Sequence, residues 1–155
     1  MKHTKEEAAR SVLLTLPQLM QAVASELRHS EHAVPMPQFG TLMMLSRGPC
    51  TLSELAEHRK VSAPTMSKTI DILEGNGWVG RSADPTDRRK TELHLTDSGT
   101  EVVKHAEERI VVLLARFLEP LDQKDLDALT AGMDVLKSVA ERVLPQDEPT
   151  AEPTE

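Results

Sequence analysis

Apolar residues recur at three- and four-residue spacing near both ends of the chain, which predicts amphipathic helices. The first helix is expected over about residues 5–32, with a kink or break near Leu16, because Pro17 has no backbone N–H to donate. Two more helices are expected over residues 96–118 and, with a heptad-like apolar seam, from Asp122 onward. These faces are more apolar than one small lobe can cover, so they indicate a two-fold dimer that buries them.

Short elements separated by turns occupy the middle of the chain. After a turn at residues 33–37, a strongly apolar helix is expected at residues 38–46. Thr51 and Glu54 have the spacing of a capping box, in which each residue satisfies a backbone donor of the other. This box predicts a short helix that ends near His58 and is followed by a tight turn.

A second capped helix follows this turn. Ser62 is its expected N-cap, and residues 75–77 end it. Apolar residues at positions i, i+4 and i+7 form its inward face: Met66, Ile70 and Leu73. Two β-like stretches come next, at residues 78–81 and 91–95, with a polar, charged tip between them. A short helix, a tight turn, a second helix and a hairpin together predict a winged helix-turn-helix.

The expected fold class is therefore mainly α with a small β-hairpin wing: a winged helix-turn-helix plus a helical dimerisation region. Residues 35–96 form the expected winged lobe, and residues 1–34 and 97–144 form the expected dimerisation region. Residues 145–155 are acidic, rich in proline and nearly free of apolar groups. This composition predicts a disordered acidic tail.

Charged residues are distributed unevenly along the chain. The 155 residues carry a net charge of −7, which alone argues against a nucleic-acid partner. However, residues 96–155 hold six Lys/Arg against fourteen Asp/Glu, whereas residues 51–95 hold seven of each. The acidic residues thus lie mainly in the C-terminal part of the expected dimerisation region and in the tail. Since no apolar run could span a membrane and the first residues lack a signal core, we expect a cytoplasmic protein with no membrane partner.

The second helix of the pair carries side chains suited to DNA. Its first two turns combine small and hydroxyl-bearing residues with one cation: Ser62, Ala63, Pro64, Thr65, Ser67 and Lys68. Small hydroxyls allow a close approach to bases and phosphates, and a lysine can contact guanine or phosphate. The alternative interpretation is that Ser62 is only an N-cap and Lys68 only a solvated charge.

The tip between the two strands is the most informative stretch. Its three adjacent cations are Arg88, Arg89 and Lys90, and they cannot belong to a core. They suit insertion of one arginine into the minor groove, with phosphate contacts by the others. Asp87 is placed to orient Arg89 through a charge-assisted pair. A merely solvated turn is the alternative.

These stretches resemble the MarR family of bacterial transcriptional regulators. The resemblance rests on TLSELAEHRKVSAPTMSKTIDILEGNGWVGR, DPTDRRKTELHLT and DSGTEV, and it spans roughly residues 10–144. It implies a homodimer that binds a pseudo-palindromic operator in double-stranded DNA, usually as a repressor. It also implies that Arg89 is the wing arginine, that Asp87 orients it, and that residues 62–68 contact bases and phosphates.

The expected DNA contacts combine the capped helices and the wing. They are Thr51, Ser62, Ala63, Pro64, Thr65, Ser67, Lys68, Arg81, Asp87, Arg88, Arg89 and Lys90.

The resemblance further implies a small-molecule effector that binds between the dimer helices and the winged lobe. The residues expected to line this pocket are His32, Met36, Phe39, Met43 and Arg47. Small phenolic or aromatic acids are the usual ligands of such relatives. Arg47 or a histidine would then meet the acidic group.

Two alternatives keep the fold but change the signal. Cys50, near a helix N-terminus and Arg47, could be a redox-sensitive thiol. A small half-buried filler explains this cysteine better, and peroxide-sensing relatives carry their cysteine in the first helix. His29, Glu31 and His32 could bind a metal, but three ligands within one turn and no thiolate match a zinc site poorly. We therefore expect no metal and no cofactor.

Other classes of protein find less support. The sequence has no Gly-x-Ser-x-Gly, no phosphate-binding glycine loop and no His-Glu-x-x-His, so we do not expect an enzyme. A winged module used only for protein contacts is the remaining alternative, and it would lack the steep salt dependence of DNA binding.

Overall fold

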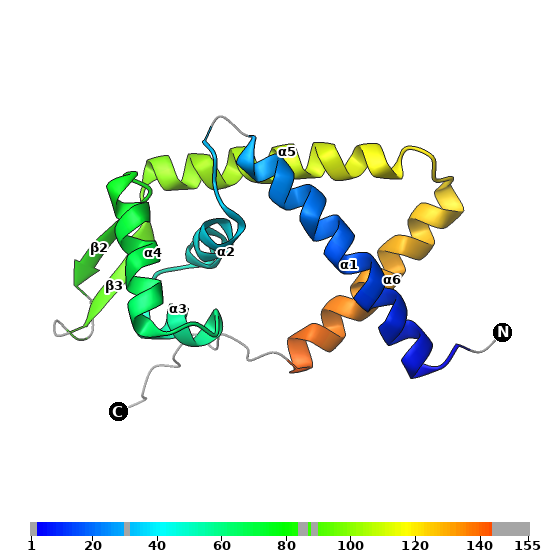
Figure 1. The fold of residues 1–155 in the computed structure, drawn as a ribbon, viewed down its shortest axis with the longest axis horizontal. Coiled ribbons are helices and arrows are strands. Elements are labelled where there is room, and N and C mark those ends of the chain that lie inside the picture. Colours follow the sequence, from blue (N-terminus) through cyan, green and yellow to red (C-terminus); the bar gives the residue numbers. More distant parts are fainter. Residues whose placement is uncertain (1–2, 30–31, 84–86, 88–89, 144–155) are drawn as a thin grey trace, which may run out of the picture. The chain divides into compact units, whose positions relative to one another are not determined.

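The computed structural model describes residues 3–29, 32–83, 87 and 90–143. Its elements are α1 (Lys5–Arg28), α2 (Met36–Leu45), β1 (Cys50–Thr51), α3 (Leu52–His58), α4 (Ala63–Gly75), β2 (Val79–Ala83), β3 (Thr91–Leu95), α5 (Asp97–Leu118) and α6 (Gln123–Val143) (Figure 1). Contacts divide the chain into two units, Met1–Leu114 and Ala115–Glu155. The predicted fold class, mainly α with a small β wing, is confirmed.

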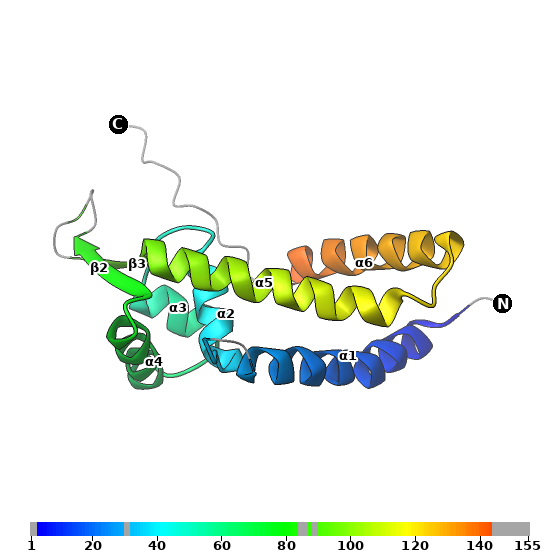
Figure 2. The same cartoon turned by 90° about the horizontal axis from the view of Figure 1, so that it is seen from above.

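Three antiparallel strands form one sheet, in the order β1-β3-β2. Val79 lies opposite Leu95 and Ala83 opposite Thr91, so β2 and β3 pair along their whole length. Both residues of β1 pair with the other edge of β3. The sequence predicted the hairpin but not β1, because two residues are too few to show strand alternation. β2 and β3 form an arm beside α4 (Figures 1 and 2).

Capping residues determine where three helices begin. Thr4 and Glu7 form a capping box before α1, with N–H to side-chain oxygen distances of 2.8 and 3.2 Å. Thr51 and Glu54 form the predicted box before α3, with distances of 2.6 and 3.3 Å. Asp122 accepts a backbone N–H at 2.9 Å and begins α6, as predicted. Each cap satisfies donors that the first turn of a helix would otherwise leave unpaired.

α1 is one continuous helix, so the predicted break near Leu16 is wrong, whereas a kink there, the other form of the expectation, stays a prediction (Figure 2). The helix continues through Pro17 because this part of α1 is exposed, and solvent can satisfy the carbonyl that Pro17 leaves without a donor. α1 also ends earlier than predicted, at Arg28, with His29 as its C-cap.

α2 begins two residues earlier than predicted, at Met36, and therefore shortens the expected turn. Pro35 is its N-cap and Pro37 lies in its first turn, where a helix needs no backbone donor. The helix contributes four buried side chains: Phe39, Thr41, Leu42 and Leu45.

The buried apolar side chains of the first unit form one cluster. It joins α1, α2, α3, α4, β2, β3 and α5, and its most buried members are Leu27, Val34, Leu42, Leu55, Ile70, Leu73 and Leu93. Burying each large apolar side chain contributes about 1.5–3 kcal/mol. The predicted inward face of α4 is confirmed, since Met66, Ile70 and Leu73 are all buried. This core holds α4 and the base of the hairpin.

Large apolar side chains remain exposed along α1, the later part of α5 and α6. Val23 and Leu27 are the buried residues of α1, whereas Leu13 and Leu14 are 70% and 62% exposed. In α6, all of whose residues are described, no side chain is buried, and Met133 is 53% exposed. Soluble monomers rarely expose such apolar surface. None of the described helices is long and apolar enough to cross a membrane.

Thr96 joins the end of the sheet to the start of α5. Its hydroxyl donates to the Gly77 carbonyl at 2.6 Å and accepts from the Gly99 N–H at 3.0 Å. Its own N–H donates to the Trp78 carbonyl at 3.0 Å. Gly99 is buried directly against that carbonyl oxygen, and a Cβ at position 99 would overlap it. A backbone atom cannot move aside as a side chain can, so the site requires glycine.

We predict that Gly99→Ala lowers the free energy of unfolding by about 2–3 kcal/mol, because overpacking here displaces backbone. Chemical denaturation followed by circular dichroism measures the change. Gly75→Ala is the control, since a Cβ at Gly75 meets nothing within 4 Å, and its expected change is within about 0.5 kcal/mol. Equal stability of Gly99→Ala and the wild type would contradict the close packing.

Candidate nucleic-acid interface

α4 presents a small, polar surface at its N-terminus. Ser62 caps the helix by accepting the Thr65 N–H at 3.3 Å, and the two hydroxyls lie 2.8 Å apart. The predicted contact residues Ser62, Ala63, Pro64, Thr65 and Lys68 are exposed, and Ser67 is half-buried. Because the opposite face of α4 is held in the core, this surface is rigid and open to solvent.

The turn between α3 and α4 is a Schellman motif, a compact helix ending with one left-handed residue. The Lys60 N–H donates to the Glu57 carbonyl and the Val61 N–H to the Ala56 carbonyl, both at 3.0 Å. Lys60 is the left-handed residue, with a φ of 52°. This motif brings α3 and α4 together in the predicted helix-turn-helix.

The same motif ends α4. The Gly77 N–H donates to the Glu74 carbonyl at 2.8 Å and the Trp78 N–H to the Leu73 carbonyl at 3.0 Å. Here the left-handed residue is Gly77, with a φ of 75°, and β2 begins two residues later. The sequence predicted the helix end at residues 75–77, and it is confirmed.

The wing extends beyond the core from the paired strands. Along β2, burial decreases from Val79 to three exposed residues, Arg81, Ser82 and Ala83. Lys90 is exposed, and its N–H donates to the Asp87 carbonyl at 2.8 Å. Arg88 and Arg89 lie outside the described residues, so the pairing of Asp87 with Arg89 stays a prediction.

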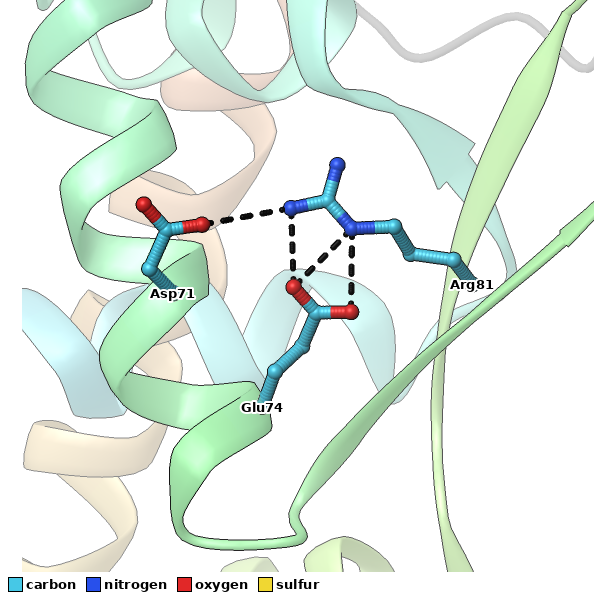
Figure 3. A network of polar contacts seen from close by, with 3 residues as sticks. All are labelled: Asp71, Glu74 and Arg81. Carbon is cyan, nitrogen blue, oxygen red and sulfur yellow. Dashed lines mark hydrogen bonds and ion pairs between the residues drawn. The ribbon is translucent and has the colours of Figure 1, made fainter.

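Arg81 forms a polar network with Glu74 and Asp71 that the sequence pattern does not predict (Figure 3). Its Nε donates to both carboxylate oxygens of Glu74 at 2.9 Å, and its Nη2 donates to Glu74 Oε2 at 2.8 Å. Nη2 also lies 3.4 Å from Asp71 Oδ1. The hydrogen bonds to the Glu74 carboxylate raise the pKa of the Arg81 guanidinium. A seven-residue separation across a turn has no sequence signature that would reveal such a pair.

Thr51 serves the local fold as well as any contact with DNA. It belongs to β1 and is the N-cap of α3, and its hydroxyl also lies 2.8 Å from Glu54 Oε2. Its expected role as a DNA contact stays a prediction.

The five residues expected to line an effector pocket occupy different environments. Phe39 is part of the core, and Met36 and Met43 are half-buried against it. His32 and Arg47 are exposed, and the His32 ring lies edge-on to Trp78 with ring centroids 6.2 Å apart. Their grouping as a pocket stays a prediction.

The residues proposed for thiol or metal sensing have structural partners. Cys50 is half-buried in β1, opposite Leu93. His29 Nδ1 lies 2.7 Å from the Ser25 carbonyl, beside the end of α1. Within the described part of the chain, no three His, Cys, Asp or Glu residues are grouped closely enough to hold a metal ion. Glu31, the third expected ligand, lies outside the described residues.

Comparison with known proteins gives consistent results. The MarR family pattern matches residues 34–91. The HTH-type transcriptional regulator YfiV of Bacillus subtilis (strain 168) is 31% identical over 107 residues, which cover 68% of this chain and 67% of YfiV. The crystal structure of RV1404 from Mycobacterium tuberculosis has a TM-score of 0.79 at 23% identity, covering 96% of this chain and all (100%) of that one.

A further structure adds a bound nucleic acid. Sco3205, a MarR family transcriptional regulator from Streptomyces coelicolor, was crystallised in complex with DNA. It has a TM-score of 0.66 at 25% identity, covering 99% of this chain and 98% of Sco3205. A winged helix-turn-helix with these relatives defines a class of transcriptional regulators rather than of enzymes. This chain belongs to the MarR family.

We predict that Lys60→Gly raises the free energy of unfolding by about 0.5–1 kcal/mol. A lysine in the left-handed conformation has a steric cost that glycine does not have. This cost exceeds the loss of stability that glycine causes through the greater backbone entropy of the unfolded chain. Urea denaturation measures the change. The reverse exchange at the matching position, Gly77→Ala, is the paired control and should cost about 1 kcal/mol. Destabilisation by Lys60→Gly would show that the lysine side chain stabilises the turn.

Proposed function

We propose that this chain is a cytoplasmic, homodimeric, sequence-specific DNA-binding regulator, and specifically a repressor that a small-molecule effector releases from DNA. The observation that carries the proposal is the exposed N-terminal face of α4, fixed by the core beside an extending wing. Sco3205, which shares this fold, was crystallised with DNA.

In this proposal α4 enters the major groove. The hydroxyls of Ser62 and Thr65 and the cation of Lys68 are exposed where the first turns of the helix would meet bases and phosphates. Thr51, Ala63, Pro64 and Ser67 complete this set, and Arg81, the remaining predicted residue, acts from β2 through its pair with Glu74. Asp87, Arg88, Arg89 and Lys90 act at the wing tip, where one arginine enters the minor groove.

The second part of the proposal is a two-fold dimer formed by residues 1–34 and 97–144, with residues 35–96 as the DNA-binding lobe and 145–155 as a disordered acidic tail. Its support is the apolar surface that α1 and α6 expose in the single chain. An isologous interface would bury that surface. It would also present two copies of α4 about 34 Å apart, one turn of a pseudo-palindromic operator.

The third part is release by an effector, for which an aromatic acid is the proposed class. His32, Met36, Phe39, Met43 and Arg47 lie on or beside α2, and exposed Arg47 supplies a cation for a carboxylate. The two DNA-binding lobes of the proposed dimer can lie at a spacing that fits the operator or at one that does not. A ligand that binds the second arrangement more tightly would lower the affinity for the operator, by an amount set by the difference between its affinities for the two arrangements.

We predict that the protein binds a duplex that it selects from a random DNA pool at least 100-fold more tightly than unselected duplex of equal length, because base contacts add to phosphate contacts. Fluorescence anisotropy across a salt series measures both affinities, and log Kd should rise steeply with log salt. Arg89→Ala should weaken binding by about tenfold, a loss of ~1.4 kcal/mol.

Lys124→Ala is the control for Arg89→Ala, since it removes the same charge from α6, outside the proposed contacts. Unchanged affinity in Arg89→Ala would remove the wing arginine from the proposal. If the protein enriches no sequence from the DNA pool and its affinity for DNA does not change with salt, the chain is instead a module for protein contacts.

We predict that Met133→Glu converts the dimer to a monomer at micromolar concentration while the chain remains folded. Met133 is 53% exposed in the single chain, so a charge there is costly only when a second copy covers it. Analytical ultracentrifugation measures the mass. Thr130→Glu, beside Asp127 and Asp134 on the polar side of α6, should leave the dimer intact. A wild-type protein that sediments as a monomer would refute the dimer.

A further inference from the structure

The Arg81–Glu74 pair connects α4 to the base of the wing. Glu74 lies in the last turn of α4, and Arg81 lies on β2 where the strand passes from buried Val79 to exposed residues. Three hydrogen bonds of 2.8–2.9 Å join the guanidinium to the carboxylate (Figure 3). The chain joins the same two elements through the turn at Gly77. The pair therefore attaches β2 to α4 in addition to the turn and to the core packing of Val79.

The pair adds a contact where the core packing of β2 ends. Val79 and Leu93 hold the base of the hairpin in the core, but beyond Gly80 the side chains of β2 are exposed, so the core leaves the direction of the outer part of the wing less restricted. A planar guanidinium bound through two nitrogens fixes direction as well as distance. The pair thus sets the angle between α4 and the wing.

The charges of this network argue against a direct phosphate contact by Arg81. Arg81 lies within 4 Å of two carboxylates, so the group carries a net charge of −1. A phosphate would meet this negative group and would compete with Glu74 for the same nitrogens. The side chains are also partly exposed, at 41% for Arg81 and 29% for Glu74, and such ion pairs add little to stability. Orientation is what the pair supplies.

We infer that Arg81 is a positioning residue: its pair with Glu74 holds the wing at the angle at which α4 and the wing tip engage DNA together. This inference rests on the proposed function. Without the pair, the wing samples many angles in the free protein, and binding must restrict them at a cost in affinity.

The test exploits the sign of the charge change. Glu74→Gln removes a negative charge, so electrostatics alone would strengthen binding to the selected duplex. Lost positioning predicts the opposite, a weakening of about three- to tenfold at 0.15 M salt, measured by fluorescence anisotropy. Glu57→Gln is the control: it removes one negative charge from an exposed position of the neighbouring α3 and leaves the three Arg81–Glu74 bonds, so its affinity should equal or exceed that of the wild type.

A second substitution separates positioning from direct contact. Arg81→Lys keeps the charge but loses the planar pair, so it should weaken binding about as much as Glu74→Gln without changing the salt slope. Exchange of the two charges in Glu74→Arg/Arg81→Glu should recover part of the affinity. Melting curves followed by circular dichroism should show every variant folded at the assay temperature, which excludes general loss of structure.

The results separate this inference from the proposed function. Wild-type affinity in both Glu74→Gln and Arg81→Lys would overturn the positioning role alone. Strong binding by Arg81→Lys with a flatter salt slope in Arg81→Ala would instead assign Arg81 to a phosphate. A wild type that binds no duplex would overturn both proposals together.

Discussion

The hydrogen bonds of Thr96 join the end of α4, the start of the wing and the first turn of α5. This residue bonds to the turn that follows α4, to the residue that begins the wing and to the first turn of α5. Gly99 allows α5 to come close enough for these bonds to form. Glu74 precedes the same turn and Arg81 follows it, so their pair bridges the turn. The core fixes where α4 lies, Thr96 fixes where the wing starts, and the ion pair fixes where it points.

Much of this fold could be predicted because its signals are local. The Thr51–Glu54 box and the Ser62 cap depend on side chains three residues from their partners, so their spacing is visible in the sequence. The inward face of α4 follows from helical periodicity, and the turn at Gly77 from the need for a left-handed residue. The same reasoning placed the exposed hydroxyls of Ser62 and Thr65 correctly.

The features that could not be predicted depend on contacts distant in sequence or on solvent. β1 exists because β3 offers it a free edge, a partner some forty residues away by the strand register. The Arg81–Glu74 pair depends on how tightly the chain turns between them. Pro17 was expected to kink or break α1, and the helix does not break there, because the local rule does not consider whether water can reach the freed carbonyl. In each case the rule used the residue and its sequence neighbours, but the outcome depended on the solvent or the distant residues around it in the folded chain.

The position of Thr51 limits the length of the chain between β1 and α3. It pairs with β3 as the last residue of β1 and caps α3, so no connecting residue separates the strand from the helix. One inserted residue would either shift the pairing, and with it the side of the sheet that each side chain faces, or separate the cap from Glu54. The fold therefore tolerates substitution at this point far better than insertion or deletion, and variation in length must be confined to its other turns.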